Sequence, residues 1–246
     1  MGAKSSDRKY NHFVGGAFVE STSDKRIDVE FPYNGERWAS VPDGSSDDVD
    51  QAVQTARETF TTWKDIKRIP RREILKSIAT AIEDNAEELA ELETRQNGKL
   101  IREMTPQMYG AAEMARHYAS LVDSERSDVV PVETKEGEMF SYVLKEPYGV
   151  VAGITPWNSP ILIALRGMLP AIAAGNTFVH KPSEQSPVSA LRFAEILSEE
   201  SDLPDGVYNV VTGGGETGAV LTEHDDVEFV SFTGSVSTGR KIGESA

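Results

Sequence analysis

The sequence predicts an α/β fold, in which helices flank a parallel sheet and a helical region precedes it. Short apolar stretches alternate with helical patterns from residue 150 onward, with short connections between them, an order typical of parallel strands joined by helices. Before that, apolar residues recur at helical spacing between residues 46 and 122. Polar motifs follow three of the apolar stretches, where a parallel sheet would bind a ligand at the carboxyl ends of its strands.

The first 45 residues are predicted to form a largely irregular arm that lies on a larger body. Turn signals occur at Gly15-Gly16, at residues 32–35 and at residues 42–44. Between these turns, only Phe18-Val19 and residues 27–31 are apolar enough to suggest short strands.

The cap of the first helix is expected to be Ser46. This serine precedes Asp47, Asp48 and Asp50, which suit a helix cap followed by an acidic first turn. Apolar residues then follow on one face of the helix, namely Val49, Val53, Ala56, Phe60 and Trp63.

Two more helices are predicted before the sheet. One should begin at Pro70, since proline suits a first helical position, and end at Asn97-Gly98. The other should run from about residue 103 to residue 122. Packing of apolar faces explains all three helices, and no chemistry is assigned to them.

A hairpin and four strand–helix units are expected in the remainder. Strand-like alternation begins near residue 133 and continues to Leu144, which predicts a strand or hairpin with an exposed face. The expected strands are 150–154, 176–180, 207–211 and 227–232, and the expected helices are 160–174, 187–198, 216–222 and one that begins near 235.

The composition limits the partners of the protein. The formal net charge is −15 and the pI is about 4.7, so nucleic acid and anionic membranes are not expected to bind. The acidic residues are spread along the chain, which indicates a charged folded surface. Two interpretations of that surface stay open: adaptation to high salt (a halophilic protein) and an acidic enzyme of ordinary habitat.

Cysteine is absent from the 246 residues, which excludes disulfides and thiolate metal sites. The histidines show no metal-ligand spacing, so no metal site is expected. No apolar run could span a membrane, and the first residues do not resemble a secretory signal. A cytoplasmic location is predicted.

Four short motifs could carry chemistry, and each also has a structural explanation. The amide of Asn158 could donate to an oxyanion or could cap a helix. Lys181 and Glu184 could bind ribose hydroxyls or form a surface ion pair. Ser235 could bind an anion at a helix N-terminus or act only as a cap. The fourth motif, residues 213–218, fits the glycine fingerprint of dinucleotide sites, but a glycine-rich turn needs no nucleotide.

Taken together and in order, these motifs resemble the aldehyde dehydrogenase superfamily. The resemblance is carried by residues 149–160 (GVVAGITPWNSP), 173–187 (AAGNTFVHKPSEQSP) and 232–235 (FTGS), with support from Gln96-Asn97-Gly98-Lys99. It covers nearly the whole chain. It implies a Rossmann-like parallel sheet, with the arm and helices of the cofactor domain in residues 1–128, an oligomerisation-type hairpin in 129–147 and the NAD(P)-binding part in 148–246.

The resemblance also assigns roles to individual residues. Asn158 matches the amide of the oxyanion hole, Lys181 and Glu184 match groups that hold the adenosine ribose, and Ser235 matches the pyrophosphate site. The other expected cofactor-binding residues are Thr155, Pro156, Trp157, Ser183, Gly215, Phe232, Thr233 and Gly234. NAD is the expected cofactor, because a 2′-phosphate would meet the charge of Glu184, although Lys181 leaves NADP possible.

Members of this family oxidise aldehydes to carboxylic acids through a cysteine thiohemiacetal and a glutamate-activated water. Neither that cysteine nor the Glu-Leu-Gly-Gly segment of that glutamate occurs here. The resemblance therefore implies that the chain ends before the catalytic domain and the last sheet strand, which would leave a sheet edge bare. We expect it to bind cofactor but to be inactive alone. The partners left open are a second copy in a homo-oligomer and a separate C-terminal catalytic chain. The alternative functions are a cofactor-binding subunit of a split enzyme and a non-catalytic structural partner or pseudogene product.

Overall fold

The computed structural model describes residues 8–124, 128–134 and 137–245, and within them the predicted α/β fold is confirmed. The main sheet of this part of the chain has six strands in the order β11-β8-β9-β10-β2-β3. Its parallel strands are β11 (Phe229–Phe232), β8 (Val150–Ile154), β9 (Thr177–Lys181) and β10 (Tyr208–Val210). The predicted strand–helix units thus form the parallel part of the sheet.

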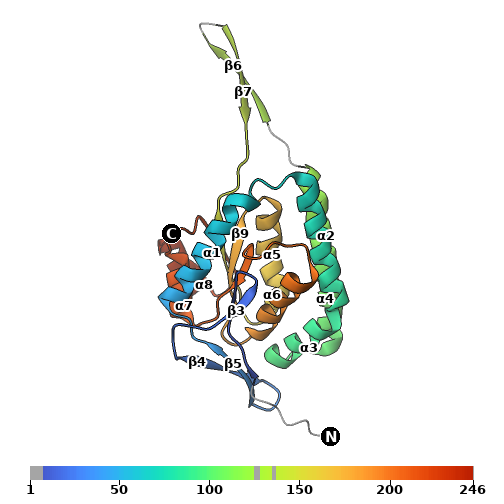
Figure 1. Cartoon of the computed structure of the whole chain (residues 1–246), viewed down its shortest axis with the longest axis vertical. Coiled ribbons are helices and arrows are strands. Elements are labelled where there is room, and N and C mark those ends of the chain that lie inside the picture. Colours follow the sequence, from blue (N-terminus) through green and yellow to red (C-terminus); the bar gives the residue numbers. More distant parts are fainter. Residues whose placement is uncertain (1–7, 125–127, 135–136, 246) are drawn as a thin grey trace.

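Helices cover both faces of this sheet (Figure 1). On one face lie α1 (Ser46–Trp63) and α7 (Gly215–Thr222), with α8 (Val236–Ser245) beside α7. On the other lie α5 (Pro160–Ala173) and α6 (Val188–Glu200), which α2 (Arg68–Asp84), α3 (Ala86–Asn97) and α4 (Ile101–Leu121) cover as a further layer. A short 3-10 helix, Val122–Ser124, follows α4. The sheet therefore separates two apolar cores.

The N-terminal arm is more regular than predicted. The two expected strands are confirmed as β3 (Ala17–Val19) and β4 (Arg26–Phe31), and the structure adds β1 (Arg8–Lys9), β2 (His12–Val14) and β5 (Glu36–Pro42). β2 pairs antiparallel with β10, while β5 pairs with β1 and β4. The largely irregular arm was therefore a wrong prediction. Strands of two or three residues are too short to show alternation, and the last five residues of β5 are all buried, which hides its period of two.

The cap of α1 is Ser45 and not Ser46. The Ser45 hydroxyl accepts a hydrogen bond from Asp48 N at 3.2 Å, and the Asp48 carboxylate accepts one from Ser45 N at 2.8 Å. This reciprocal capping box places the acidic residue three positions after the cap. Two adjacent serines carry the same sequence signal, so the prediction was one residue off.

The second predicted helix is two helices, because the chain turns at Asn85. This residue leaves helical geometry, with φ −107° and ψ 14°, and its side-chain amide donates to Ala81 O at 3.0 Å. Ala81 O also accepts from Asn85 N at 3.3 Å, so the side chain adds a second donor to a carbonyl in the last turn of α2. The predicted stop is confirmed, since Gly98 follows α3 with φ 76° in the left-handed region that glycine favours.

The predicted hairpin is present as β6 (Asp128–Thr134) and β7 (Gly137–Val143), and it extends away from the helices and the main sheet (Figure 1). Several of its large apolar side chains are exposed, among them Val129, Met139, Phe140 and Tyr142. Its role in oligomerisation stays a prediction. Among the described residues, no helix combines the length and the apolar character that crossing a membrane requires.

Candidate functional site

The sequence motifs meet at one edge of the sheet because the ends of three parallel strands are in register. Ile154 pairs with Lys181 on one side and with Phe232 on the other. The segments that follow these residues therefore leave the sheet at the same level. This confirms that the three motifs lie at the carboxyl ends of neighbouring strands, where ligands of parallel sheets bind.

A groove runs across these strand ends. One part of it is a cavity of about 510 Å³ lined by Thr155, Pro156, Lys181, Ser183, Glu184, Gly215, Phe232, Thr233, Gly234 and Ser235, among others. A second part, of about 580 Å³, adds Trp157 and Asn158. Both parts are lined by Pro156, Ser183, Glu184, Thr233, Gly234 and Ser235. All twelve residues that the sequence proposed for the site thus border one continuous groove.

Lys181 lies buried at the floor of the groove, with 4% of its surface exposed. Its ammonium donates hydrogen bonds to Pro182 O at 2.9 Å and to Gly213 O at 2.7 Å, and lies 4.0 Å from the Glu184 carboxylate. Burial lowers the pKa of Lys181 to about 8, against the opposing effect of the carboxylates of Glu184 and Asp43. The ammonium is therefore held in place by hydrogen bonds, and its pKa lies closer to neutral pH than that of an ordinary lysine.

The loop after β9 turns the Glu184 carboxylate toward solvent. The Ser183 hydroxyl accepts from Gln185 N at 3.3 Å, and Ser183 O accepts from Ser186 N at 3.1 Å, which fixes a tight turn around Glu184. The Ser186 hydroxyl also donates to Trp157 O at 3.1 Å and joins this loop to the one after β8. The side chain of Glu184 is 47% exposed, so its carboxylate is available to a ligand.

The segment after β11 requires glycine. A Cβ added at Gly234 would lie 2.5 Å from the Phe232 ring, closer than any side chain tolerates. The Ser235 hydroxyl accepts a hydrogen bond from Thr238 N at 3.1 Å, so Ser235 caps α8. The cap interpretation of Ser235 is thus correct, and it does not exclude the anion-binding one, because Ser235 also borders the groove.

Asn158 and Trp157 border the outer end of the groove, and both are exposed. The Lys99 ammonium donates to the Ser159 hydroxyl at 2.8 Å, and that hydroxyl donates to Asn158 O at 2.6 Å. The backbone of Asn158 is therefore tied to the end of α3 through two side chains. Ser159, the residue before α5, makes no side-chain cap to the helix.

Two side chains of α3 take over the capping of α5 and α6. Glu93 accepts from Ile161 N in the first turn of α5 at 3.1 Å and from the Ser189 hydroxyl at 2.9 Å. Gln96 accepts from Val188 N at 2.9 Å and from Ser189 N at 3.2 Å at the start of α6. Both helices begin directly after groove loops. The packing layer that was assigned no chemistry therefore positions the loops of the site.

Glu93 should make stability depend on pH below neutrality. Burial raises its pKa to about 7, against the hydrogen bonds from Ile161 and Ser189 and the charge of Lys99. The folded state then binds more protons than the unfolded state between about pH 4.5 and 7, so the free energy of unfolding should fall by about 3 kcal/mol as pH rises through that window. Urea titrations at several pH values should show this fall, and Glu93→Gln should remove it. Glu87→Gln, an exposed change on the same helix, is the control; an equal slope in Glu93→Gln would contradict the assignment.

The glycine-rich turn at residues 213–218 does not offer a free amide at its start. Gly214 N donates to the Asp43 carboxylate at 3.0 Å, and the Thr217 hydroxyl donates to Gly44 O at 2.7 Å. A Cβ at Gly213 would lie 2.1 Å from the Thr217 hydroxyl, so this glycine serves close packing. The structural explanation of the fingerprint therefore holds at its start, although Gly215 still borders the groove.

Sequence reasoning missed the helical walls of the groove. These residues belong to α7, its C-cap and α8, namely Gly218, Ala219, Thr222, Glu223, Thr238, Lys241, Ile242 and Ser245. Their spacing of three or four residues places them on one face of each helix, a signal that a pass for helix faces could have found. Within the described residues, no group of three acidic or histidine side chains could hold a metal ion.

Comparison with known proteins identifies the family. The sequence profile described as the Aldehyde dehydrogenase family matches residues 18–246, so this chain belongs to that family. It is similar to an NAD-dependent aldehyde dehydrogenase from Sinorhizobium meliloti, with 36% identity and a TM-score of 0.91 over 98% of this chain and 48% of the other.

Two further solved structures show the same relation. A putative aldehyde dehydrogenase from Burkholderia cenocepacia is 38% identical, with a TM-score of 0.91 over 96% of this chain and 48% of the other. Betaine aldehyde dehydrogenase from Staphylococcus aureus, in complex with NAD+, is 34% identical, with a TM-score of 0.90 over 96% of this chain and 47% of the other. The chain thus spans about half the length of the structures it matches.

Proposed function

We propose that this chain binds NAD in the groove at the strand ends and is the cofactor-binding portion of an aldehyde dehydrogenase. The observation that carries the proposal is that Asn158, Lys181 and Ser235 border one continuous groove, although they lie far apart in the sequence. The N-terminus of α8, which Ser235 caps, and the exposed Glu184 carboxylate fit an extended dinucleotide. The S. aureus relative has NAD+ in its structure.

Each end of the groove would have its own task. Glu184 and Lys181 would hold a ribose, with the carboxylate accepting from its hydroxyls, while Ser235 and the first turn of α8 would face the pyrophosphate. Asn158 lies at the outer end, where its amide would donate to the oxygen of an aldehyde as negative charge develops on it. Bound NAD would supply the hydride acceptor.

The chain cannot complete this reaction with its own residues. The 246 residues contain no cysteine, so a thiolate nucleophile would have to come from outside them. We propose that the chain binds cofactor without oxidising aldehydes, and that residues beyond these 246 or a second chain supply the nucleophile and the general base.

A cofactor-binding subunit of a split enzyme is a second candidate, and exposed apolar surface favours it. Within the described residues β11 pairs with β8 alone, and Phe229 of β11 and Val236 of α8 are 47% and 75% exposed. None of the described side chains of α8 is buried. A strand edge and helix face of this kind favour a protein partner. Co-purification of a chain that carries the nucleophile would support this candidate over the single-chain one.

Calorimetric titration of NAD into the purified chain tests the proposed function. We expect saturable heat, and we expect Glu184→Gln to weaken binding by about tenfold, because a charge-assisted hydrogen bond to ribose is lost. Glu216→Gln is the matched control, since Glu216 is exposed in the first turn of α7 and does not border the groove. No heat at millimolar NAD, or equal losses in both variants, would argue against the site.

A further inference from the structure

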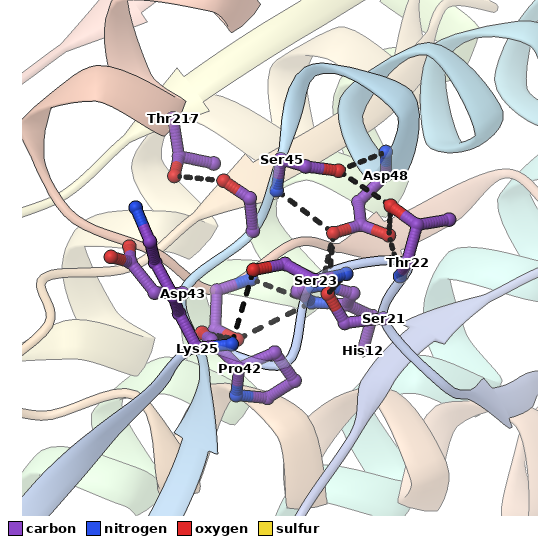
Figure 2. Close-up of polar contacts among 12 residues, drawn as sticks. His12, Ser21, Thr22, Ser23, Lys25, Pro42, Asp43, Ser45, Asp48 and Thr217 are labelled. Atoms are coloured by element: carbon purple, nitrogen blue, oxygen red, sulfur yellow. Dashed lines mark hydrogen bonds and ion pairs between the residues drawn. The ribbon is translucent and has the colours of Figure 1, made fainter.

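The arm contacts the glycine-rich turn through a set of short polar contacts, and Figure 2 shows the one that Thr217 makes. Besides the bonds from Gly214 N to Asp43 and from Thr217 to Gly44 O, Gly44 N donates to Thr212 O at 3.0 Å. The Thr212 hydroxyl donates to Pro42 O at 2.8 Å. Residues 42–44 therefore form hydrogen bonds both to Thr212, before the turn, and to Gly214 and Thr217 within it. Only one of these contacts uses a charged side chain, and it is the one that Asp43 makes.

Asp43 brings its charge close to the buried lysine of the groove. Its carboxylate accepts from Gly214 N, and the Lys181 ammonium donates to the carbonyl of the neighbouring Gly213. One peptide unit thus lies between the two contacts. Burial lowers the pKa of Lys181, and Asp43 and Glu184 are the two carboxylates that oppose this effect. The buried cation therefore faces two acidic groups.

The groove around Lys181 consequently carries an excess of negative charge. Lys241 is the other cation that lines the cavity, and Glu184 and Glu223 are its acidic lining residues. Asp43, which does not line the cavity, adds a negative charge where its carboxylate accepts from Gly214 N. The nearby Lys25, whose carbonyl accepts from Asp43 N at 2.9 Å, has an exposed side chain, so solvent and salt screen its charge.

We propose that Asp43 is a specificity-determining residue of the groove. Its carboxylate occupies the amide at the start of the glycine-rich turn, and its charge disfavours binding of a 2′-phosphate and therefore of NADP. The proposal rests on the proposed function, because it concerns the same groove. Asp43 acts by position and charge and does not touch the cofactor. It satisfies the amide with which the turn could bind a phosphate oxygen. Its charge also repels a group that adds up to two negative charges.

Asp43→Asn separates these effects from a structural role. The asparagine carbonyl can still accept from Gly214 N, so the turn should keep its shape while the charge is lost. We expect NADP to bind about tenfold more tightly, from the loss of one like charge near the phosphate. NAD affinity should change less than about twofold, since NAD carries no group at that position. The measurement is the ratio of the two dissociation constants, obtained by calorimetry on the whole chain at fixed salt.

Two further variants serve as controls. Asp43→Glu keeps the charge and should keep the wild-type ratio, whereas Asp47→Asn removes an exposed charge from the same part of the chain and should leave the ratio unchanged. Circular dichroism melts establish that each variant is folded, and Asp43→Ser offers the same charge change if the asparagine variant is not.

The outcomes distinguish this inference from the function on which it rests. An NADP gain confined to the uncharged variants supports the role of Asp43. Wild-type binding of NAD with an unchanged ratio in Asp43→Asn would overturn the inference and leave the proposed function intact. A wild-type chain that binds neither dinucleotide would overturn both.

Discussion

Replacement of Asp48 by alanine should cost about 3 kcal/mol of unfolding free energy, because it removes the charged acceptor that several hydrogen bonds share. The Asp48 carboxylate accepts from Ser45 N at 2.8 Å, from Thr22 N at 2.8 Å and from the Ser21 hydroxyl at 2.6 Å. The His12 ring lies 3.4 Å from it, and both side chains are 1% exposed. Truncation would leave these partly buried donors without their shared charged acceptor.

The same cluster predicts how acid weakens the fold. Burial alone would raise the pKa of Asp48, but the hydrogen bonds from Ser21, Thr22 and Ser45 hold it well below its usual range. A carboxyl whose folded pKa is depressed stabilises the protein above its unfolded pKa, and that contribution is lost as pH falls toward the folded value. The loss of stability that protonation of Asp48 causes should therefore appear below about pH 4.

Urea unfolding followed by circular dichroism measures both effects. Asp48→Ala should lower the midpoint at pH 7 and should also lose part of the acid dependence below pH 4. Asp47→Ala is the matched control, since Asp47 is the exposed neighbour in the same helical turn; it should cost less than about 1 kcal/mol. Similar losses in the two variants would show that the buried cluster contributes nothing beyond helix capping.

Local sequence pattern was sufficient for the elements that place the groove. The strand Val150–Ile154 was predicted to the residue, because a short, wholly apolar run between turn signals has few alternatives. The motif residues Asn158, Lys181 and Ser235 could be assigned to the strand ends, since each lies within about four residues of the end of such a run. Whether a residue lies near a strand end depends on its neighbours in the chain, so a single sequence is enough to predict it.

The residues that hold the site in place gave no comparable signal. Asp43 contacts a turn 171 residues further along the chain, and within its own segment it reads only as a turn residue. Glu93 lies within a helix whose other acidic residues are mostly exposed, so its burial depends on α5 and α6 packing beside it. Such roles arise from tertiary contacts. Local periodicity does not encode them.

Lys181→Met should weaken NAD binding by about a hundredfold, the largest effect expected in the groove. The variant keeps the volume of the buried stem but removes the ammonium, and hydrogen bonds to a charged donor contribute about 1.5 to 3 kcal/mol each. It also leaves Gly213 O without its donor, which loosens the turn beside the ribose site. Calorimetric titration of NAD measures the loss. Lys241→Met, an exposed change in the same groove, should cost less than about threefold, because solvent screens its charge.

The proton on Lys181 supplies an independent check. Its pKa in the folded protein is about 8, below the ordinary 10.5, so the unfolded chain binds more protons between these values. The free energy of unfolding should therefore rise by about 3 kcal/mol as pH increases through this window, and Lys181→Met should lack the rise. NAD affinity should fall over the same rise in pH, because the neutral amine donates more weakly than the ammonium. Stability and affinity thus move in opposite directions with pH. An affinity independent of pH from 7 to 10 would mean that the buried ammonium does not contact the cofactor.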